Sequence, residues 1–569
     1  MNENNIEREN SMQCETVGTA VTDRVEVTDK SNDPYAYLER SEFTSEKFKI
    51  EIRNLPKYYG FNELKKLLKS KLNLNPTKIK TPAPKGGWSY VCFKSEEEKA
   101  TALKILNGYT WKKQTLIAQE AKAVPDPLVK KRNLKSNDSN ISSKRVKLDV
   151  KDLLEQLESK KNQIKMSLKK YSNELIKANP ELSKWCKQQE SKYNNLPCEL
   201  LPIRHSNVIN GYRNKCEFSI GINESTGERT VGFRLGSYVE GSVSVGPIDE
   251  VLNVPETMKI AAKSFEKFVQ NSKYDVFSPE LHKGYWKQLT VRYGFRTNEL
   301  MLIVGLDPQQ LTSEELCNLK NDIEKYFKEG DGSSCPVHSL YLQKIKKRKS
   351  QDDVPALEHV FGETYITEKI LGKTFRISPQ AFFQVNSNAT DILYESIGEL
   401  AGLKNNVTLL DVCCGTGTIG LCLAEKCDEV LGLEMTAEAI ADARVNADLN
   451  GVKNAEFFVG KAEDVLSSVA YKAKNEEIVA IVDPPRAGLH RSALLQIRSN
   501  EKIKKLVFVA CDHRKAVKNF VDLGRATSKI YKGEPFLAVK AIPVDLFPHT
   551  PHCELITYFE RYYDDNDGR

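Results

Sequence analysis

Apolar runs of strand length recur along the last third of the chain, separated by stretches long enough for helices. Runs suited to strands buried on both faces are found at 407–412, 429–434, 478–482, 506–511 and 555–559. Strands that are apolar throughout, rather than alternating, are typical of parallel sheets covered by helices on both faces. The pattern predicts an α/β domain with a Rossmann-like, mostly parallel sheet over residues 376–562.

Residues 195–375 alternate between apolar and polar positions and are interrupted by turn residues. Strands are expected near 212–220, 231–234 and 289–292. Alternation with a period of two places one face of each strand in a core and the other in solvent. This segment is predicted to be a central β-rich domain.

Residues 46–123 form a third pattern, with strands expected at 49–53, 89–93 and 115–120 and helices at 61–71 and 96–106. This order resembles an RNA-recognition motif, in which Trp88 and Tyr90 would stack on bases. However, Glu51 stands where the first strand of that motif offers an aromatic side chain, and Gly86 replaces a basic residue. Weak or atypical RNA binding is expected, with a protein-binding face as the alternative.

The remaining segments are polar. Residues 1–45 are predicted to be a disordered tail, 124–150 a basic linker and 563–569 an acidic tail. The linker carries Lys130-Lys-Arg132 and Lys144-Arg-Val-Lys147, whose spacing is typical of a bipartite nuclear-import signal, although a solvated linker is the alternative. We therefore expect the protein in the nucleus and cytosol.

Residues 151–194 form an amphipathic helical segment in which leucines and other apolar residues recur every three or four positions up to about Ala178. Such a helix can dock on its own domain or form a coiled-coil dimer. Docking is the preferred interpretation, and a monomer is expected; protein partners are unknown.

Composition narrows the class of protein. With 569 residues the chain is expected to hold about three or four domains. The excess of 84 Lys and Arg over 77 Asp and Glu gives a charge of +7, which is compatible with an acidic partner but does not demonstrate one. No apolar run approaches the roughly 18 residues of a membrane span.

The 13 cysteines are scattered without a C-x-x-C pair, so reduced thiols in an intracellular protein are expected and an iron–sulfur cluster is not. Cys413 and Cys414 are interpreted as packing residues. His549 and His552 lack the partners of a zinc site, so no metal is expected.

A glycine-rich turn follows the strand at 407–412. Gly415, Gly417 and Gly420 match G-x-G-x-x-G, and Glu434 lies nineteen positions after Gly415 at the end of the next strand. Glycines let the backbone approach a nucleotide-like ligand, and an acid at this distance can accept hydrogen bonds from ribose hydroxyls. These features alone would also fit a nicotinamide-dependent enzyme.

Polar residues at the ends of the later strands separate these alternatives. Asp483-Pro-Pro-Arg486 follows one strand, Cys511 ends another, and Glu554 lies beside the last strand. Ligands of open α/β sheets bind at the carboxyl ends of the strands, so these side chains are expected at one site. A nicotinamide-dependent oxidoreductase would have no use for Cys511 or Glu554.

With these residues the chain resembles the S-adenosylmethionine-dependent RNA (uracil-5-)-methyltransferases, in particular their animal two-domain branch, over roughly residues 195–562. The motifs that carry the resemblance are Trp286–Arg292, His359–Tyr365, Phe382-Phe-Gln-Val-Asn386, Asp411-Val-Cys-Cys-Gly-Thr-Gly417, Asp483-Pro-Pro-Arg486, Cys511 and His552-Cys-Glu554. The resemblance implies methyl transfer from S-adenosyl-L-methionine to C5 of a uridine in tRNA or other structured RNA, most readily a T-loop uridine.

The resemblance also implies roles for individual residues. Cys511 would add to C6 of uracil, Arg486 would favour its thiolate, and Glu554 would later remove the C5 proton. Gln384, Gly415, Gly417, Glu434 and Asp483 would form the cofactor pocket. The central domain would complete the RNA cleft, with contacts from Tyr212, Arg213, Lys215 and Arg234.

One departure from the family pattern concerns the nucleophile. The family has Asn-Pro directly after this cysteine, whereas the chain has Asp512-His513. An acid beside a thiolate should raise the pKa of the thiol unless Asp512 points away or pairs with His513 or Arg514. The alternative is therefore an RNA-binding or tRNA-folding protein that keeps the fold and has lost catalysis.

Overall fold

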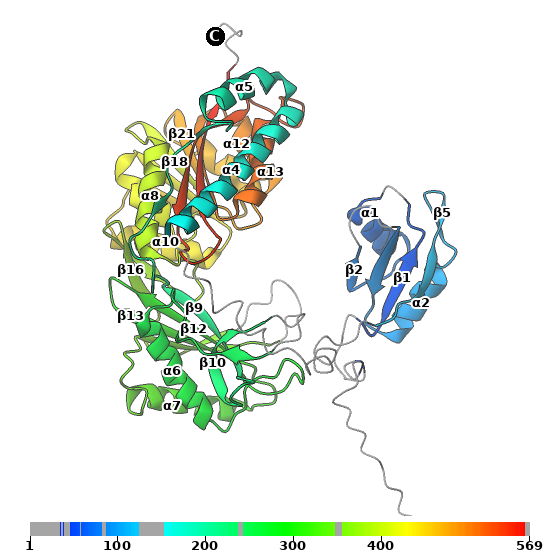
Figure 1. Ribbon diagram of the computed structural model, residues 1–569, viewed down its shortest axis with the longest axis vertical. Helices are drawn as coiled ribbons and strands as arrows, with labels where there is room; N and C mark the ends of the chain where they lie inside the picture. Colours follow the sequence, from blue (N-terminus) through cyan, green and yellow to red (C-terminus); the bar gives the residue numbers. More distant parts are fainter. Residues whose placement is uncertain are drawn as a thin grey trace, which may run out of the picture. The chain divides into compact units, whose positions relative to one another are not determined.

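The computed structural model describes residues 35, 38, 46–56, 59–81, 87–123, 153–236, 243–346 and 356–563. The chain divides into two compact units, one in the N-terminal region and one comprising most of the rest (Figure 1). The predicted tail 1–45, linker 124–150 and acidic tail 563–569 lie almost entirely outside the described residues.

The first unit is a four-stranded antiparallel sheet with the strand order β2-β3-β1-β6. Its main elements are β1 (Lys49–Arg53), α1 (Phe61–Lys66) continued by a π-helical turn (Leu67–Lys71), β2 (Lys78–Lys80), β3 (Trp88–Cys92), α2 (Glu96–Leu106) and β6 (Ile117–Glu120). Ile50, Ile52 and Val91 are buried in the core of this unit. The predicted elements are present except that the strand expected at 115–120 begins at Ile117, and the short strands β2, β4 (Thr110–Trp111) and β5 (Gln114–Thr115) are additional.

A seven-stranded sheet occupies the middle of the second unit, in the order β11-β10-β9-β12-β13-β14-β15. Its strands are β9 (Lys215–Ile222), β10 (Arg229–Arg234), β11 (Val245–Gly246), β12 (Trp286–Gly294), β13 (Glu299–Leu306), β14 (Ser339–Lys344) and β15 (Ala356–Gly362). The amphipathic helices α6 (Glu256–Asn271) and α7 (Ser313–Lys328) bury their apolar faces against this sheet (Figure 1).

A nine-stranded sheet forms the C-terminal part, with the main order β20-β19-β18-β21-β22-β24-β23-β7. The strands β18 (Val407–Val412), β19 (Glu429–Glu434), β20 (Ala455–Val459), β21 (Glu477–Val482) and β22 (Ile503–Ala510) are parallel. The strands β23 (Phe536–Asp545) and β24 (Glu554–Arg561) are antiparallel to each other, and β24 is antiparallel to β22.

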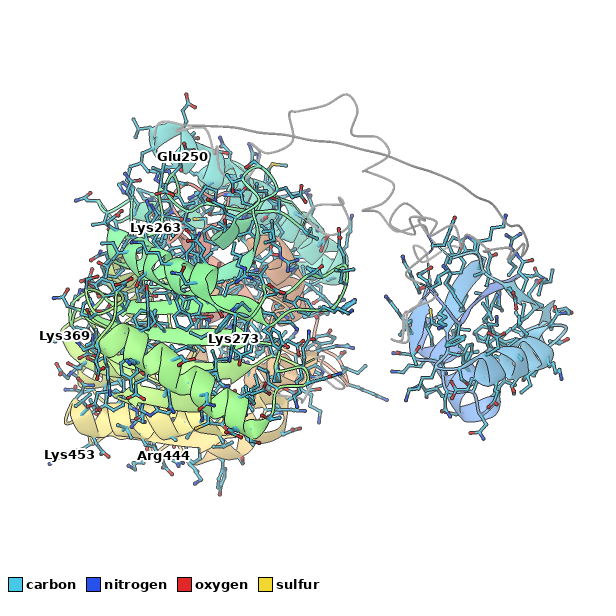
Figure 2. All side chains as sticks on the ribbon, turned by 90° about the horizontal axis from the view of Figure 1, so that it is seen from below. Glu250, Lys263, Lys273, Lys369, Arg444 and Lys453 are labelled. Atoms are coloured by element: carbon cyan, nitrogen blue, oxygen red, sulfur yellow. The ribbon has the colours of Figure 1, made fainter. Side chains whose placement is uncertain are left out.

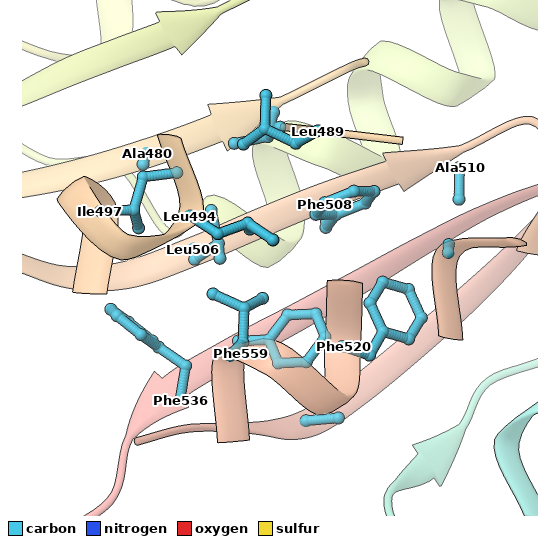
Figure 3. Packing of buried hydrophobic residues seen from close by; sticks show 14 of the residues in the cluster. Ala480, Leu489, Leu494, Ile497, Leu506, Phe508, Ala510, Phe520, Phe536 and Phe559 are labelled. Carbon is cyan, nitrogen blue, oxygen red and sulfur yellow. The ribbon is translucent and has the colours of Figure 1, made fainter. Parts of the chain in front are cut away.

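Helices cover both faces of this sheet, which explains why its strands are apolar throughout. One core includes α4 (Leu153–Ala178), α11 (Ala462–Tyr471), α12 (Arg491–Ser499) and α13 (His513–Gly524). The other includes α8 (Ser387–Ala401), α9 (Thr418–Leu423) and α10 (Ala437–Leu449). Figure 3 shows the first core, where Phe508 of β22 and Phe520 of α13 pack with ring centroids 5.3 Å apart.

The predicted limits of the central domain, 195–375, are wrong at both ends. The strands β7 (Glu199–Leu200) and β8 (Arg204–His205) pair with β23 and so belong to the C-terminal sheet. The hairpin of β16 (Ile366–Ile370) and β17 (Lys373–Ile377) packs into the second core of that sheet. Pairing between strands far apart in the chain decides these limits, and periodicity cannot reveal such pairing.

The amphipathic segment 151–194 contains α4 and α5 (Ser183–Lys192), and α4 docks on the C-terminal sheet's own helix layer (Figure 1). Ile164, Leu168 and Tyr171 are buried there with Phe520 of α13. The preferred interpretation of this segment is confirmed. It is an integral part of the fold around the C-terminal sheet rather than a separate segment.

Candidate active site

A cavity of about 1350 Å³ opens at the edge of the C-terminal sheet where the parallel strands end. Residues of the central part, including Arg213 and Leu357, form another side of its wall. Every residue predicted for catalysis lines it, as do four of the five predicted to hold a cofactor: Gln384, Gly415, Glu434, Asp483, Arg486, Cys511 and Glu554. Gly417 lies in the same turn as Gly415 but does not line the cavity.

Strand pairing brings Cys511 and Glu554 together. The last residue of β22, Ala510, pairs with Leu555 of the antiparallel strand β24. Cys511 follows Ala510 and Glu554 precedes Leu555, so both side chains belong to the same end of adjacent strands. Ala510 and Phe508 are buried in the core below, which anchors this end of β22 (Figure 3).

The Cys511 thiol is protonated at neutral pH in the free protein. Burial raises its pKa to about 11, and the nearby carboxylates of Glu554 and Asp483 act in the same direction. Arg486 opposes them by lowering the pKa of the thiol, and Asp512 raises it least among these neighbours. The thiolate therefore needs additional positive charge, or removal of a carboxylate charge, when ligands enter the cavity.

Glu554 is almost completely buried, with 3% of its surface exposed. Burial raises the pKa of its carboxyl well above the usual range, and Arg486 acts in the opposite direction. Its Oε2 atom has no hydrogen-bond partner within the described part of the chain. A carboxyl group in such surroundings is a strong base once it is ionised, and its free oxygen is available to a substrate proton.

Asp483 and Gln384 both line the cavity and contact each other. The Nε2 atom of Gln384 donates a hydrogen bond to Oδ2 of Asp483 across 3.4 Å. Burial raises the pKa of Asp483 to about 7, while the hydrogen bond from Gln384 acts to lower it. Asp483 is therefore partly ionised at neutral pH.

The residues after the nucleophile do not disrupt it. Asp512 turns toward Lys515, with 3.1 Å between Oδ2 and Nζ, and begins α13. His513 is buried, and its Nδ1 atom lies 2.7 Å from Oγ of Ser167 on α4. The acid beside Cys511 is thus paired with a base, and the unusual His513 forms part of the contact with α4.

The glycine turn has the geometry of a nucleotide-binding turn. Gly415 and Gly417 adopt left-handed backbone angles, with φ of 55° and 78°. A Cβ atom on Gly417 would lie 3.0 Å from the Phe457 ring, whereas one on Gly415 would meet no atom within 4 Å. Gly417 therefore allows close packing of the protein, and Gly415 keeps the cavity open for a ligand.

Glu434 closes the ligand side of this turn. Its Oε2 atom accepts a hydrogen bond from the Gly415 amide over 3.4 Å, and its Oε1 atom accepts one from the Thr436 amide over 3.0 Å. The carboxylate still lines the cavity. Together with Asp483 and Glu554 it gives the cavity an acidic lining, which fits a ribose and a positively charged group. The residues present therefore fit S-adenosylmethionine.

The residues predicted to contact RNA are found in different places. Arg213 lines the main cavity, and Lys215 lines a smaller one beside it. Arg234 is exposed at the end of β10 and lines neither. Trp88 and Tyr90 belong to the first unit, where their rings lie 4.9 Å apart in an edge-to-face contact.

The prediction that Tyr212 stacks on RNA is wrong. Only 1% of its surface is exposed, and its hydroxyl donates a hydrogen bond to the carbonyl of Pro548 over 3.0 Å. Tyr212 therefore supports the loop that leads to Glu554. Burial by a loop more than three hundred residues away in the chain could not be inferred from the local pattern.

Three residues near the site received no role from the sequence. Phe382 is 68% exposed and lines the cavity, Arg292 is buried beside it, and Lys160 contacts the loop before Glu554. Phe382 and Arg292 lie in the recognised motifs, which could have marked them. Lys160 lies in a helix whose apolar spacing gave no indication of a site.

Two negative observations apply to the described residues only. They contain no group of three or more His, Cys, Asp or Glu side chains placed to hold a metal ion. No helix among them combines the length and apolar character needed to cross a membrane.

Comparison with known proteins agrees with this geometry. Residues 403–540 match a family model described as a methyltransferase domain. The chain is 41% identical to mouse tRNA (uracil-5-)-methyltransferase homolog A over 541 residues, which cover 94% of this chain and 87% of the mouse protein. It is also 41% identical to human homolog B over 374 residues, covering 65% and 74% of the two chains.

A solved structure shows the same α/β methyltransferase fold. The Pyrococcus abyssi tRNA (uracil-54, C5)-methyltransferase in complex with S-adenosyl-L-homocysteine matches with a TM-score of 0.53 and 22% identity, covering 79% of this chain and 91% of that chain. At this identity the likeness concerns the fold. Because the mouse relative is similar along nearly its whole length, the chain belongs to the tRNA (uracil-5-)-methyltransferase family.

Proposed function

We propose that this protein transfers a methyl group from S-adenosyl-L-methionine to C5 of a uridine in tRNA. The observation that carries the proposal is the pairing of Ala510 with Leu555, which sets Cys511 beside Glu554 at the cavity that also holds the glycine turn. The relatives named as tRNA (uracil-5-)-methyltransferases support tRNA as the substrate.

Gly415 and Glu434 would hold the nucleoside of S-adenosylmethionine, with the Glu434 carboxylate accepting hydrogen bonds from ribose hydroxyls. Gln384 and Asp483 would line the path from there to the uridine. When bound, S-adenosylmethionine supplies an electrophilic methyl group on a positively charged sulfonium, a charge that favours ionisation of nearby acids. The acidic lining of the cavity provides these acids.

Cys511 starts the reaction because uracil C5 is a poor nucleophile. After losing its proton to water, its thiolate forms a bond with C6, and the electrons of the C5–C6 double bond move toward O4 to give an enolate. Arg486 lowers the pKa of the thiol, so it stabilises the reacting thiolate. The enolate makes C5 nucleophilic enough to accept the methyl group.

Glu554 completes the reaction. Once C5 carries the methyl group, its remaining hydrogen must leave as a proton. The ionised Glu554 takes this proton, the double bond between C5 and C6 forms again, and Cys511 leaves C6 as a thiolate. The raised pKa of Glu554 suits this step, because burial makes the carboxylate a stronger base than it would be in water.

The test is transfer of labelled methyl from S-adenosylmethionine to unmodified tRNA. The native protein should produce 5-methyluridine, and Cys511→Ala should produce none. Glu554→Gln should accumulate a protein–RNA adduct that survives denaturation, because methylation can proceed whereas elimination cannot. Cys553→Ala is a matched control, since Cys553 is a buried neighbour that does not line the cavity.

A protein that binds tRNA without catalysis is the alternative, motivated by Ala510-Cys511-Asp512-His513, which stands where the family has Ser-Cys-Asn-Pro. The ion pair of Asp512 with Lys515 argues against a disabled thiol. Binding of both RNA and S-adenosylmethionine without methyl transfer would favour the alternative. Binding of a nicotinamide cofactor instead would exclude both.

For the first unit we propose an RNA-recognition-motif-like domain that contacts RNA weakly. The order of its elements and the sheet order β2-β3-β1-β6 support this. Trp88 and Tyr90 lie on the sheet face that also holds Glu51, whose carboxylate accepts hydrogen bonds from Arg53 and Gln119 over 3.1 and 2.9 Å. Glu51 therefore occupies a place on this face where the motif offers an aromatic ring, which removes one stacking contact, and weak binding is proposed for that reason.

Substitution in the full chain tests this domain. Trp88→Ala with Tyr90→Ala should lower tRNA affinity by about 30-fold or more if both rings stack on bases, since each stacked base contributes about 1–3 kcal/mol. Phe61→Ala is the control, because Phe61 is 48% exposed at the start of α1. Equal affinities for all three proteins would favour a protein-binding face.

The remaining proposals concern substrate position, cell compartment and assembly. We propose a T-loop uridine as the target, to be checked by mapping 5-methyluridine in tRNA after the reaction.

Localisation to the nucleus and cytosol is proposed from the two basic clusters, which lie outside the described residues. Alanine substitution of Lys130–Arg132 and Lys144–Lys147 should abolish nuclear entry. A monomer is proposed, to be checked by light scattering.

A further inference from the structure

A second cavity, of about 410 Å³, adjoins the active site on the side of the central sheet. It shares Arg213, Phe382 and Phe383 with the main cavity, so the two are neighbours with a common wall. The other polar side chains in its lining come from β9, β12 and the loop before α6. Three of the lining residues are cationic: Arg213, Lys215 and Arg292.

Arg292 is a buried cation that has no anionic partner among the residues the structure describes. Only 3% of its surface is exposed. Its Nη2 atom donates a hydrogen bond to the carbonyl of Ala381, and its Nε atom has no partner among the described residues. No carboxylate of the described chain lies within ion-pair distance of it. Burial lowers its pKa to about 10, so the side chain is still charged at neutral pH.

Lys215 adds a second cation directly opposite. It is the Cα partner of Arg292 across the antiparallel pair of β9 and β12, so the two side chains share one face of the sheet. Like charges directly opposite each other in a sheet destabilise it, and a buried unpaired charge is costlier still. This arrangement is unfavourable unless an anion enters the pocket.

Among the described residues of the lining, Glu217 is the one that carries a carboxylate, and it does not neutralise the three cations. Its Oε1 atom lies 2.7 Å from Nζ of Lys215, and its side chain is 55% exposed. With one negative and three positive side chains, the pocket keeps an excess of two positive charges. Arg213 is fixed beside them by a hydrogen bond from its Nε atom to the carbonyl of Lys215 over 3.2 Å.

We propose that this second cavity binds a backbone phosphate of the RNA adjacent to the target uridine, with Arg292 as its buried anchor. The inference rests on the proposed function, because it takes the uridine to occupy the main cavity. A nucleotide strand entering that cavity carries a phosphate on either side of the target base. A guanidinium recognises two phosphate oxygens at once, which a lysine cannot do.

The experiment measures affinity for a set of T-arm RNA hairpins in which a single linkage is replaced by a neutral methylphosphonate. Native protein should lose about 10-fold to 100-fold in affinity at one or two linkages next to the target uridine. Arg292→Gln should lose a similar factor with unmodified RNA and show no further loss at those linkages. For Arg292→Gln, the slope of log affinity against log salt concentration should become less negative by about 0.7, the value for one phosphate contact in a single strand.

Three further variants keep the test decisive. Lys215→Gln should reproduce part of the effect, and Glu217→Gln should raise RNA affinity, because it removes the one negative charge of the pocket. Lys263→Gln is the charge-matched control, since Lys263 lies on α6, which packs on the same sheet (Figure 2). Its side chain is 49% exposed and pairs with Asp249, and neither residue lines the pocket. Thermal unfolding and S-adenosylhomocysteine binding report whether each variant is folded.

The proposal is overturned if every neutral linkage lowers the RNA affinity of Arg292→Gln by the same factor as it lowers that of native protein. Arg292 would then have a structural role. If Arg292→Gln does not fold, Lys215→Gln and Glu217→Gln provide the test. The proposal is then overturned if, in both variants, the loss of RNA affinity at each neutral linkage equals that of native protein. Since binding is measured without turnover, failure here leaves methyl transfer by the native protein intact. Absence of methyl transfer would instead show that the proposed function has failed.

Discussion

Lys160 and Asp545 form a buried ion pair, with 2.7 Å between Nζ and Oδ1 and side-chain exposures of 2% and 0%. Lys160 also donates to the carbonyl of Phe547 over 3.0 Å. It lies on α4, whereas Asp545 ends β23, from which the chain runs through a loop to Glu554. A helix at the start of the second unit thus holds the loop that precedes the proposed base.

Removal of one partner of this pair should destabilise the protein strongly. We expect Lys160→Ala to lower the free energy of unfolding by about 3–5 kcal/mol, because it leaves the Asp545 carboxylate buried without its counter-ion. Urea unfolding measures the change. Lys170→Ala is the control: this lysine lies on the same helix, is 60% exposed and should alter stability by no more than about 0.5 kcal/mol.

Removing both charges tests the cause. The double variant Lys160→Ala with Asp545→Asn should be more stable than Lys160→Ala alone, since no unpaired charge remains. Equal stability of the two proteins would show that packing of the lysine side chain, rather than charge, maintains this contact.

His513 predicts a loss of stability in acid. Burial lowers its pKa to about 4 in the folded protein from a usual value of 6.5. Between these two values the unfolded chain binds more protons, so stability present above pH 6.5 is lost as pH falls toward 4. The loss should reach roughly 2–3 kcal/mol by pH 4.

His513→Gln removes this titrating group, so the decline in unfolding free energy between pH 6.5 and 4 should become shallower. The measurement is urea unfolding at a series of pH values for both proteins. Parallel curves would mean that other groups cause the acid sensitivity.

Arg486 should set the pH dependence of catalysis. In the free protein both Cys511 and Glu554 have raised pKa values, and Arg486 lowers both. Because the two groups must ionise, kcat/KM should rise as pH increases above neutrality. Arg486→Gln should move this rise to higher pH and lower kcat/KM by about 10-fold near pH 7.5 for a pKa change of one unit.

Arg491→Gln is the control for Arg486, since Arg491 stacks on Tyr531 away from the cavity, 5.0 Å from the ring centroid. It should leave the pH profile unchanged. A profile of Arg486→Gln that is lower at every pH without a shift would show that Arg486 positions RNA rather than tuning ionisation.

The two glycines of the turn should respond differently to alanine. Both have left-handed backbones, so each substitution should cost about 1–2 kcal/mol in backbone strain. Gly417→Ala should cost a further 1–3 kcal/mol or so, because its Cβ would lie 3.0 Å from the Phe457 ring and 3.2 Å from Ala443.

Gly415→Ala should instead weaken cofactor binding, because its Cβ would project into space that the protein leaves open. Unfolding experiments and calorimetric titration with S-adenosylhomocysteine, run on both variants, separate the two effects. Equal cofactor affinity in Gly415→Ala and the native protein would place the ligand away from this turn.

The pattern of apolar and polar residues is sufficient to predict the parallel strands of the C-terminal sheet and the residues that gather at its edge. Uniformly apolar strands indicate a sheet buried on both faces, and polar residues directly after them must meet at one edge. This local rule was sufficient for Asp483, Cys511 and the glycine turn. Recognition of the family motifs supplied the roles of Gln384 and Glu554.

The segments that support this site from elsewhere in the chain become visible in the tertiary contacts. The pairing of β7 and β8 with β23, the burial of Tyr212 beneath the loop at Pro548, and the contact of Lys160 with Asp545 each join residues hundreds of positions apart. Hydrophobic periodicity reports whether a residue is buried but not against which partner. Arg292 likewise indicates an anion site only because the structure shows that it is buried and has no anionic partner in the described chain.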